Sequence, residues 1–178
     1  MRKECSSEES ACFEAEYLRV LKQRGVAVPG VIGLEGRVVK LEYIEGLTLP
    51  DFLADEANAV RCSALAMNIA SWFESFYAAV RHASTGEIRG DVNGRNFIVT
   101  KEDAVFGVDF ESRVFGKRET DLGRLLAFVK TYTFDNKKTQ ETLENELVSA
   151  FLRRFSLSSD ALETETAREI REMAKRRR

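Results

Sequence analysis

The fold is inferred from two segments: Glu87-Ile88-Arg89-Gly90-Asp91-Val92-Asn93-Gly94-Arg95-Asn96-Phe97-Ile98-Val99 and, after a polar turn, Phe106-Gly107-Val108-Asp109-Phe110-Glu111. The apolar run at 97–99 predicts a buried strand, and 104–108 predicts the strand that returns beside it. Gly94 permits a tight loop between Asp91 and Asn96. The pattern therefore places Asp91, Asn96 and Asp109 at one end of a hairpin.

Two carboxylates and an amide at this spacing are typical of a phosphoryl-transfer site. Such a reaction needs mainly positioning and charge neutralisation from the protein. Asp91 is the candidate base for an acceptor hydroxyl, and Asn96 and Asp109 are candidate Mg²⁺ ligands, because this ion prefers oxygen ligands beside phosphates. A D-x-x-x-x-N spacing is common by chance, so the prediction depends on the strands around it.

These motifs resemble the aminoglycoside phosphotransferase and choline kinase branch of the protein-kinase-like fold, whose motif reads H-G-D-x-x-x-x-N followed by I-D-F or I-D-W. Arg89 stands where that branch usually has histidine, and Asp121 resembles its aspartate that accepts backbone hydrogen bonds from the catalytic loop. The resemblance implies an α+β, two-lobed fold. Residues 1–46 would form a reduced N-terminal lobe without the strands of the glycine-rich loop, and residues 47–178 a mainly helical C-terminal lobe.

A helix is predicted over residues 6–24, with Ser6 as its cap. It resembles the helix whose glutamate, in the kinase-like fold, pairs with a lysine that holds the nucleotide phosphates. Glu14 is the first choice for this glutamate and Glu16 the second, while the alternative of two solvated carboxylates stays open. Lys3 is the candidate lysine.

Residues 41–49 resemble the hinge that joins the two lobes in this branch. There the main chain hydrogen-bonds the edge of adenine, so Glu42, Tyr43 and Ile44 are expected to bind the nucleotide through backbone groups. By itself the segment reads as an ordinary strand, turn and helix start.

The remaining elements follow from periodicity and capping residues. Thr48 is predicted to cap a short helix, Trp72 to lie in the core, and His82 to have no catalytic role. Strands are predicted at 31–34 and 37–43, helices at 58–82, 121–132, 141–155 and from Ser158 onward, and a charged loop at 112–120.

Composition excludes several classes of protein. The 178 residues include 27 basic and 29 acidic side chains, so a net charge of −2 gives no global field for nucleic acid. Three cysteines lack metal-binding spacing and are expected to be reduced thiols of a cytoplasmic protein. No apolar run is long enough for a membrane span, so no membrane partner is expected.

The resemblance implies an ATP- and Mg²⁺-dependent phosphotransferase that acts on the hydroxyl group of a small molecule. Two alternatives stay open: a degenerate kinase-like module that binds a nucleotide or a protein without transfer, and a homodimer or partner chain that completes the N-terminal lobe. Glu111 is expected either to assist a second metal ion or to lie on the surface. The late acidic residues, which would suit a cationic acceptor, are Asp135, Glu141, Glu144 and Glu146.

Overall fold

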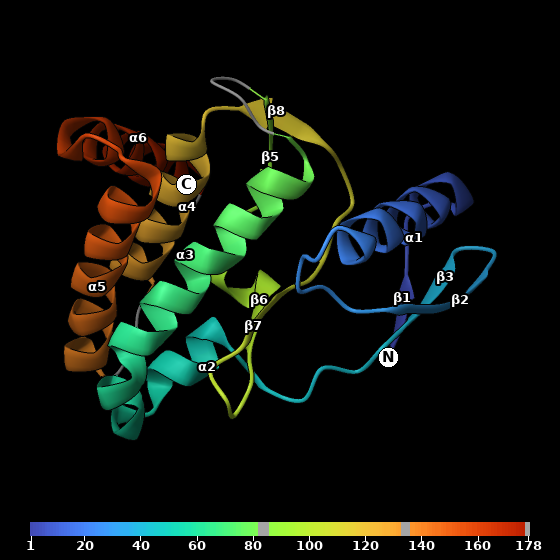
Figure 1. The fold of residues 1–178 in the computed structure, drawn as a ribbon, viewed down its shortest axis with the longest axis horizontal. Coiled ribbons are helices and arrows are strands. Elements are labelled where there is room, and N and C mark those ends of the chain that lie inside the picture. The colour runs from blue at the N-terminus through green and yellow to red at the C-terminus, as the bar shows by residue number, and fades with distance from the viewer. Residues whose placement is uncertain (82–85, 133–135, 177–178) are drawn as a thin grey trace.

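The computed structural model describes residues 1–81, 86–132 and 136–176. The chain forms a mixed α/β structure in which helices predominate and the sheets are small (Figure 1). Its elements in order are β1 (Arg2–Glu4), α1 (Glu8–Gln23), β2 (Val31–Glu35), β3 (Val38–Leu41), β4 (Leu47–Thr48), α2 (Leu49–Ala54), the 3₁₀ helix η1 (Glu56–Arg61), α3 (Cys62–Ala79), β5 (Gly86–Ile88), the 3₁₀ helix η2 (Gly94–Asn96), β6 (Phe97–Val99), β7 (Val105–Gly107), β8 (Val114–Gly116), α4 (Arg118–Thr131), α5 (Lys137–Phe155) and α6 (Ser159–Arg176).

The N-terminal part is a three-stranded antiparallel sheet, ordered β1-β3-β2, with α1 beside it (Figure 1). Lys3 in β1 pairs with Val39 in β3. The helix is capped by Ser7, whose hydroxyl accepts a hydrogen bond from the Ser10 N–H at 3.1 Å, so the prediction that Ser6 caps it was wrong. Both serines precede acidic residues of the first turn, and the local pattern does not distinguish them.

A second small sheet, ordered β4-β6-β7, lies between this part and the helices (Figure 1). The predicted hairpin is confirmed as β6 and β7, with Phe97 opposite Gly107. Thr48 caps α2 as predicted and accepts from the Asp51 N–H at 3.3 Å. A hydrogen bond from the Val108 N–H to the Asn96 carbonyl, 2.9 Å long, extends the pairing to the point where the site begins.

The helices share an aromatic core centred on α3. Trp72 stacks on Phe76 with 5.7 Å between ring centroids and meets Phe97 of β6 edge-on at 5.2 Å. The Trp72 indole N–H also donates to the Ala27 carbonyl at 2.9 Å, which joins the helices to the segment before β2. The expectation that Trp72 is a core residue is confirmed. Leu122, Leu125, Leu126 and Val129 of α4 are all buried and complete this core.

Several predicted boundaries were wrong. The helix expected at 58–82 begins as η1, whose first turn is capped by Asp55, and becomes α-helical only at Cys62. The loop expected at 112–120 contains β8, which pairs with β5, and α4 already begins at Arg118. Such short strands form through their partners, which a local pattern does not reveal. His82 lies outside the described residues.

Among the helices described, none combines the length and the apolar character that a membrane span requires.

A close approach in the core gives a test of the fold. A Cβ atom at Gly107 would lie 2.2 Å from the Trp72 ring, whereas one at Gly33 would make only ordinary contact, 3.6 Å from the Lys40 side chain. Gly107→Ala should therefore lower the free energy of unfolding by about 1–3 kcal/mol through overpacking. Gly33→Ala, the control, should change it by less than about 0.5 kcal/mol. Urea denaturation measures both, and equal stabilities would contradict this packing.

Candidate active site

The loop after β5 brings Asp91 and Asn96 together. The Asn96 side-chain N–H₂ donates to the Asp91 carboxylate at 3.0 Å and to the Asp91 carbonyl at 3.3 Å. Asn93 begins η2 by accepting from the Arg95 N–H, which turns the chain back toward the hairpin. Both of these contacts use the side-chain nitrogen of Asn96. No donor in the described part of the chain reaches Asn96 Oδ1. Asp91 is exposed, so its carboxylate is open to a ligand, whereas Asn96 is buried.

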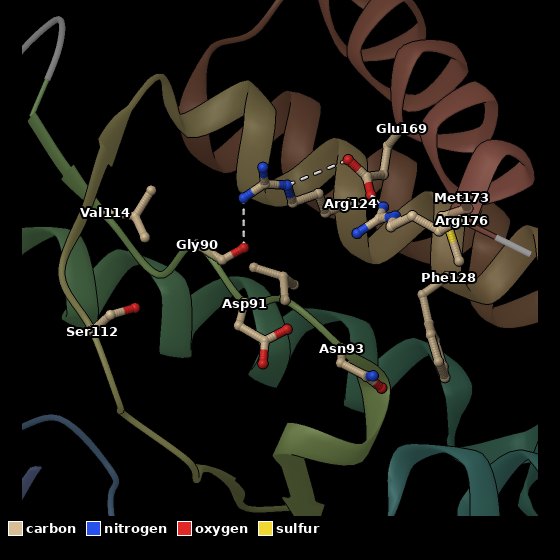
Figure 2. Close-up of a pocket in the computed structure, with 11 residues that line it drawn as sticks. Gly90, Asp91, Asn93, Ser112, Val114, Arg124, Phe128, Glu169, Met173 and Arg176 are labelled. Atoms are coloured by element: carbon tan, nitrogen blue, oxygen red, sulfur yellow. Dashed lines mark hydrogen bonds and ion pairs between the residues drawn. The ribbon is translucent and has the colours of Figure 1, made fainter. Parts of the chain in front are cut away.

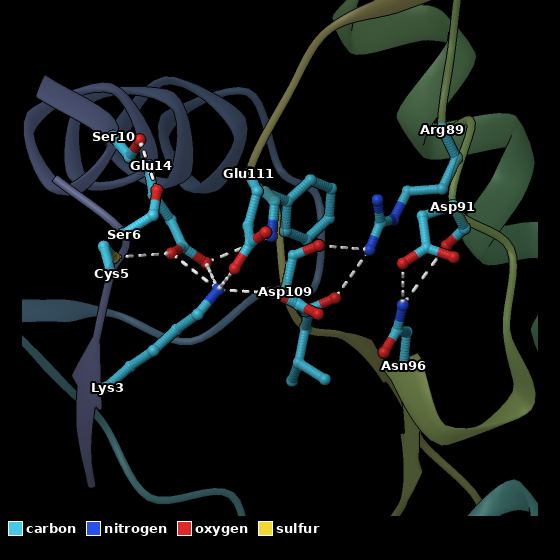
Figure 3. Close-up of polar contacts among 12 residues, drawn as sticks. Lys3, Cys5, Ser6, Ser10, Glu14, Arg89, Asp91, Asn96, Asp109 and Glu111 are labelled. Carbon is cyan, nitrogen blue, oxygen red and sulfur yellow. Dashed lines mark hydrogen bonds and ion pairs between the residues drawn. The ribbon is translucent and has the colours of Figure 1, made fainter.

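Asp109 follows β7 at the same end of the hairpin. Its φ of 67° is in the left-handed region, which turns the chain sharply after the strand. Figure 3 shows its side chain between the Asp91–Asn96 pair and the Lys3–Glu14 pair. The structure thus brings together residues that the sequence placed there from strand pattern alone.

Lys3 and Glu14 form an ion pair across the N-terminal sheet and α1. The Lys3 ammonium lies 2.8 Å from a fully buried Glu14 carboxylate, which also accepts from the Phe110 N–H at 3.0 Å. Glu16 is exposed, so the geometry favours the first choice. The same ammonium contacts Asp109 and, at 3.1 Å, Glu111. Burial alone would lower the pKa of Lys3, but its hydrogen bonds with Asp109 and Glu14 outweigh that effect and raise the pKa above its ordinary value.

Arg89 joins the loop after β5 to the β6–β7 hairpin. Its buried guanidinium donates to the Val108 and Asp109 carbonyls at 2.7 and 2.6 Å, and lies 4.1 Å from the centroid of the Phe110 ring. Burial lowers the pKa of Arg89, and the nearby carboxylates, Asp91 first among them, oppose that effect. The sequence showed that Arg89 stands in place of the expected histidine, but it did not reveal that this arginine binds the Val108 and Asp109 carbonyls.

Asp121 fixes the backbone of the loop from the first turn of α4. Its carboxylate accepts from the Arg89 and Gly90 N–H groups at 2.7 and 2.9 Å, and from the Tyr77 hydroxyl at 3.1 Å. Burial raises the pKa of Asp121, while the two backbone hydrogen bonds act against that shift. These contacts are the ones that the resemblance implied.

The expected hinge, residues 42–44, lies apart from this cluster. The Glu42 carboxylate contacts Lys22 at 2.6 Å and the Gly30 N–H at 2.9 Å, so its side chain is committed to the N-terminal part. Among residues 1–81, 86–132 and 136–176, no hydrogen bond or ion pair joins residues 42–44 to Lys3, Glu14 or Asp109. The Tyr43 and Ile44 N–H groups likewise have no acceptor there.

One constellation was missed by the sequence analysis. Glu87, a carboxylate in β5 with 2 % of its side chain exposed, accepts from the Tyr17 hydroxyl and from Arg113 Nε at 2.8 Å. Tyr17 lies one turn after Glu14 on α1, so these contacts tie that helix to the segment behind the catalytic loop. The sequence signal that could have indicated this cluster was Glu87 itself, an acidic residue within a short strand that is otherwise buried.

A cavity of about 430 Å³ opens beside Asp91 (Figure 2). Its walls come from the catalytic loop, the segment leading into β8, and helices α4 and α6. Glu141, Glu144 and Glu146 are not among its lining residues: Glu144 pairs with Lys130 and Glu146 with Ser63, and Asp135 lies outside the described part of the chain. Glu141, Glu144 and Glu146 therefore do not give this cavity an acidic lining. Its full set of lining residues is Gly90, Asp91, Val92, Asn93, Ser112, Val114, Arg124, Phe128, Glu169, Met173 and Arg176.

No family model matches the sequence, and no curated protein matches it. Solved structures do match the fold, among them the crystal structure of an aminoglycoside-3′-phosphotransferase of type VIII, with a TM-score of 0.63 and 15% sequence identity. The match covers 93% of this chain and 81% of that one. A structural match at such low sequence identity shows the fold alone, and that fold is kinase-like.

The Asp121 contacts predict a large loss of stability on substitution. Asp121→Ala leaves two buried N–H groups without an acceptor, which should lower the free energy of unfolding by about 2–5 kcal/mol. Asp121→Asn keeps one acceptor oxygen and should lose less. Glu141→Ala, at an exposed position of α5, is the control and should change little. Chemical denaturation gives the three values; an Asp121→Ala protein as stable as the control would refute the role of this carboxylate.

Proposed function

We propose that this chain is a phosphotransferase that moves the terminal phosphoryl group of Mg-ATP to a hydroxyl group of a small molecule. The observation that carries the proposal is the arrangement of Asp91, Asn96 and Asp109 next to the Lys3–Glu14 pair (Figure 3). A base, two oxygen ligands and a buried lysine–glutamate pair are the parts that phosphoryl transfer needs. In this proposal residues 1–46 and 47–178 are the two lobes.

Asp91 orients the acceptor. The hydroxyl oxygen forms a bond to the γ-phosphorus while the bond from that phosphorus to the oxygen shared with the β-phosphate breaks. ADP leaves with the electron pair of that bond, and the hydroxyl proton passes to the Asp91 carboxylate. The hydrogen bond from Asn96 holds this carboxylate in place, and the cavity gives the acceptor access to it.

The residues present fit a magnesium ion. Asn96 offers an amide oxygen without a donor, and Asp109 offers a carboxylate with 38% of its side chain exposed. No cluster of three or more His, Cys, Asp or Glu side chains suited to a metal occurs within the described residues. Two protein ligands agree with the way Mg²⁺ is held, since it keeps several waters and phosphate oxygens. When bound, the ion neutralises charge on the β- and γ-phosphates.

Lys3 and the hinge would bind the rest of the nucleotide. Lys3 would exchange its contacts with Asp109 and Glu111 for phosphate oxygens, while Glu14 keeps it in place. The backbone of Glu42, Tyr43 and Ile44 would receive the edge of adenine. The open N–H groups of Tyr43 and Ile44 support this assignment.

Asp109→Asn tests the nucleotide site. Mg-ATP that binds only the native protein must raise its melting temperature. We expect the wild-type protein to show this shift and Asp109→Asn to bind Mg-ATP at least tenfold more weakly, a loss of about 1.4 kcal/mol. Glu102→Gln, exposed in the turn of the same hairpin, should bind as the wild type does. The assignment of Asp109 fails if its variant and the control bind equally.

Asp91→Asn tests the chemistry separately from binding. Loss of the base should reduce ADP formation in the presence of an acceptor by about 10²–10⁴-fold while the Mg-ATP thermal shift persists. A coupled assay for ADP measures the rate. Wild-type protein that binds Mg-ATP but forms no ADP with any acceptor would instead identify a nucleotide-binding module without transfer.

A further inference from the structure

We propose that the cavity beside Asp91 selects an acceptor that carries an anionic group, a carboxylate or a phosphate, in addition to its hydroxyl. This inference rests on the proposed function and adds a class of substrate to it. It comes from the side chains of α4 and α6 that form the far wall of the cavity (Figure 2).

Two arginines converge on one glutamate in that wall. Arg124 Nε of α4 lies 3.4 Å from the Glu169 carboxylate of α6, and Arg176, two turns further along α6, contacts the same carboxylate. The wall therefore carries two positive charges against one negative charge. Only the Arg124–Glu169 pair joins α4 to α6. The Arg176–Glu169 pair lies within α6, and 65% of the Arg176 side chain is exposed, so its guanidinium is accessible to a ligand.

Each guanidinium also retains an unused donor. Arg124 uses Nε for Glu169 and Nη1 for the Gly90 carbonyl at 2.5 Å, and its Nη2 has no acceptor in the part of the chain that the structure describes. Arg176 uses Nε for the Glu172 carbonyl and Nη2 for Glu169, which leaves Nη1. Guanidinium groups bind carboxylates and phosphates through paired N–H donors.

Arg124 is held close to Asp91. The hydrogen bond from Arg124 to the Gly90 carbonyl fixes its guanidinium beside the residue that precedes Asp91. The helices that carry the arginines approach closely, because a Cβ at Gly123 would lie only 2.9 Å from Glu165 and the Thr166 nitrogen. One small molecule can thus place its hydroxyl at Asp91 and an anionic group at the α4–α6 wall.

The rest of the cavity suits the carbon skeleton of such a molecule. Val92, Val114, Phe128 and Met173 supply apolar surface in the lining of the cavity. Glu169, the carboxylate at the far end, already has two guanidinium partners. A cationic acceptor would meet the surplus positive charge of that wall, whereas an anionic acceptor would be attracted to it.

Matched acceptors test the inference directly. With the wild-type protein saturated by Mg-ADP, calorimetry compares glycerate and glycerol 3-phosphate with glycerol, and gluconate with glucose and glucosamine. We expect at least one anionic compound to bind tenfold or more tightly than its neutral and cationic counterparts. Equal affinities, tighter binding of the neutral or cationic compounds, or no binding of any anionic compound would overturn the inference.

Three variants assign the preference to the wall. Arg176→Gln should weaken binding of the anionic compound about tenfold, while Arg168→Gln, which removes a guanidinium paired with Glu165 elsewhere on α6, should not. Glu169→Gln frees both arginines and should tighten anionic binding. An effect of Glu169→Gln in the opposite direction would show that the carboxylate binds the ligand and would refute the proposal.

The thermal shift with Mg-ATP distinguishes failure of the proposed function from failure of the proposed substrate class. Its absence would remove the proposed function, and with it the basis for an acceptor. A normal shift together with a neutral or cationic preference would remove only the substrate class.

Discussion

A buried guanidinium connects the parts of the proposed site. Arg89 binds the carbonyls that flank the turn at Asp109, while its own N–H and that of Gly90 are bound by Asp121. Burying a charge is costly unless it is hydrogen-bonded. The two carbonyls and the Phe110 ring offset part of this cost for Arg89, whereas its Nε has no acceptor among the described residues. The loop after β5, the hairpin and α4 are therefore held in one relative position, which places Asn96 and Asp109 near each other.

The hairpin and its ends were accessible from the sequence because they depend on local pattern. An apolar triplet, a polar turn and a return strand predicted β6 and β7, and a threonine before a proline predicted the start of α2. The pairing of Lys3 with Glu14 also agrees with expectation, although the resemblance supplied it rather than the residues alone. Their part in binding nucleotide stays a prediction.

What the sequence did not reveal depends on contacts between distant segments. β8 exists because β5 pairs with it, and Glu87 is buried because Tyr17 and Arg113 satisfy its oxygens. The α4–α6 wall of the cavity beside Asp91 is formed by helices that meet only in three dimensions, and Glu141, Glu144 and Glu146 are not among the lining residues. Local propensity carries no information on such partners.

In the proposed site Asn96 and Asp109 hold the metal of a bound nucleotide. The most direct measurement uses Mn²⁺ in place of Mg²⁺, bound with ATP, and records which NMR signals of the protein the paramagnetic ion broadens. This placement of the metal predicts that broadening is strongest at the Asn96 side-chain amide and at the Asp109 and Phe110 backbone amides, and weaker at the signals of α5. Broadening centred on another part of the chain, or none at saturating Mn-ATP, would contradict it.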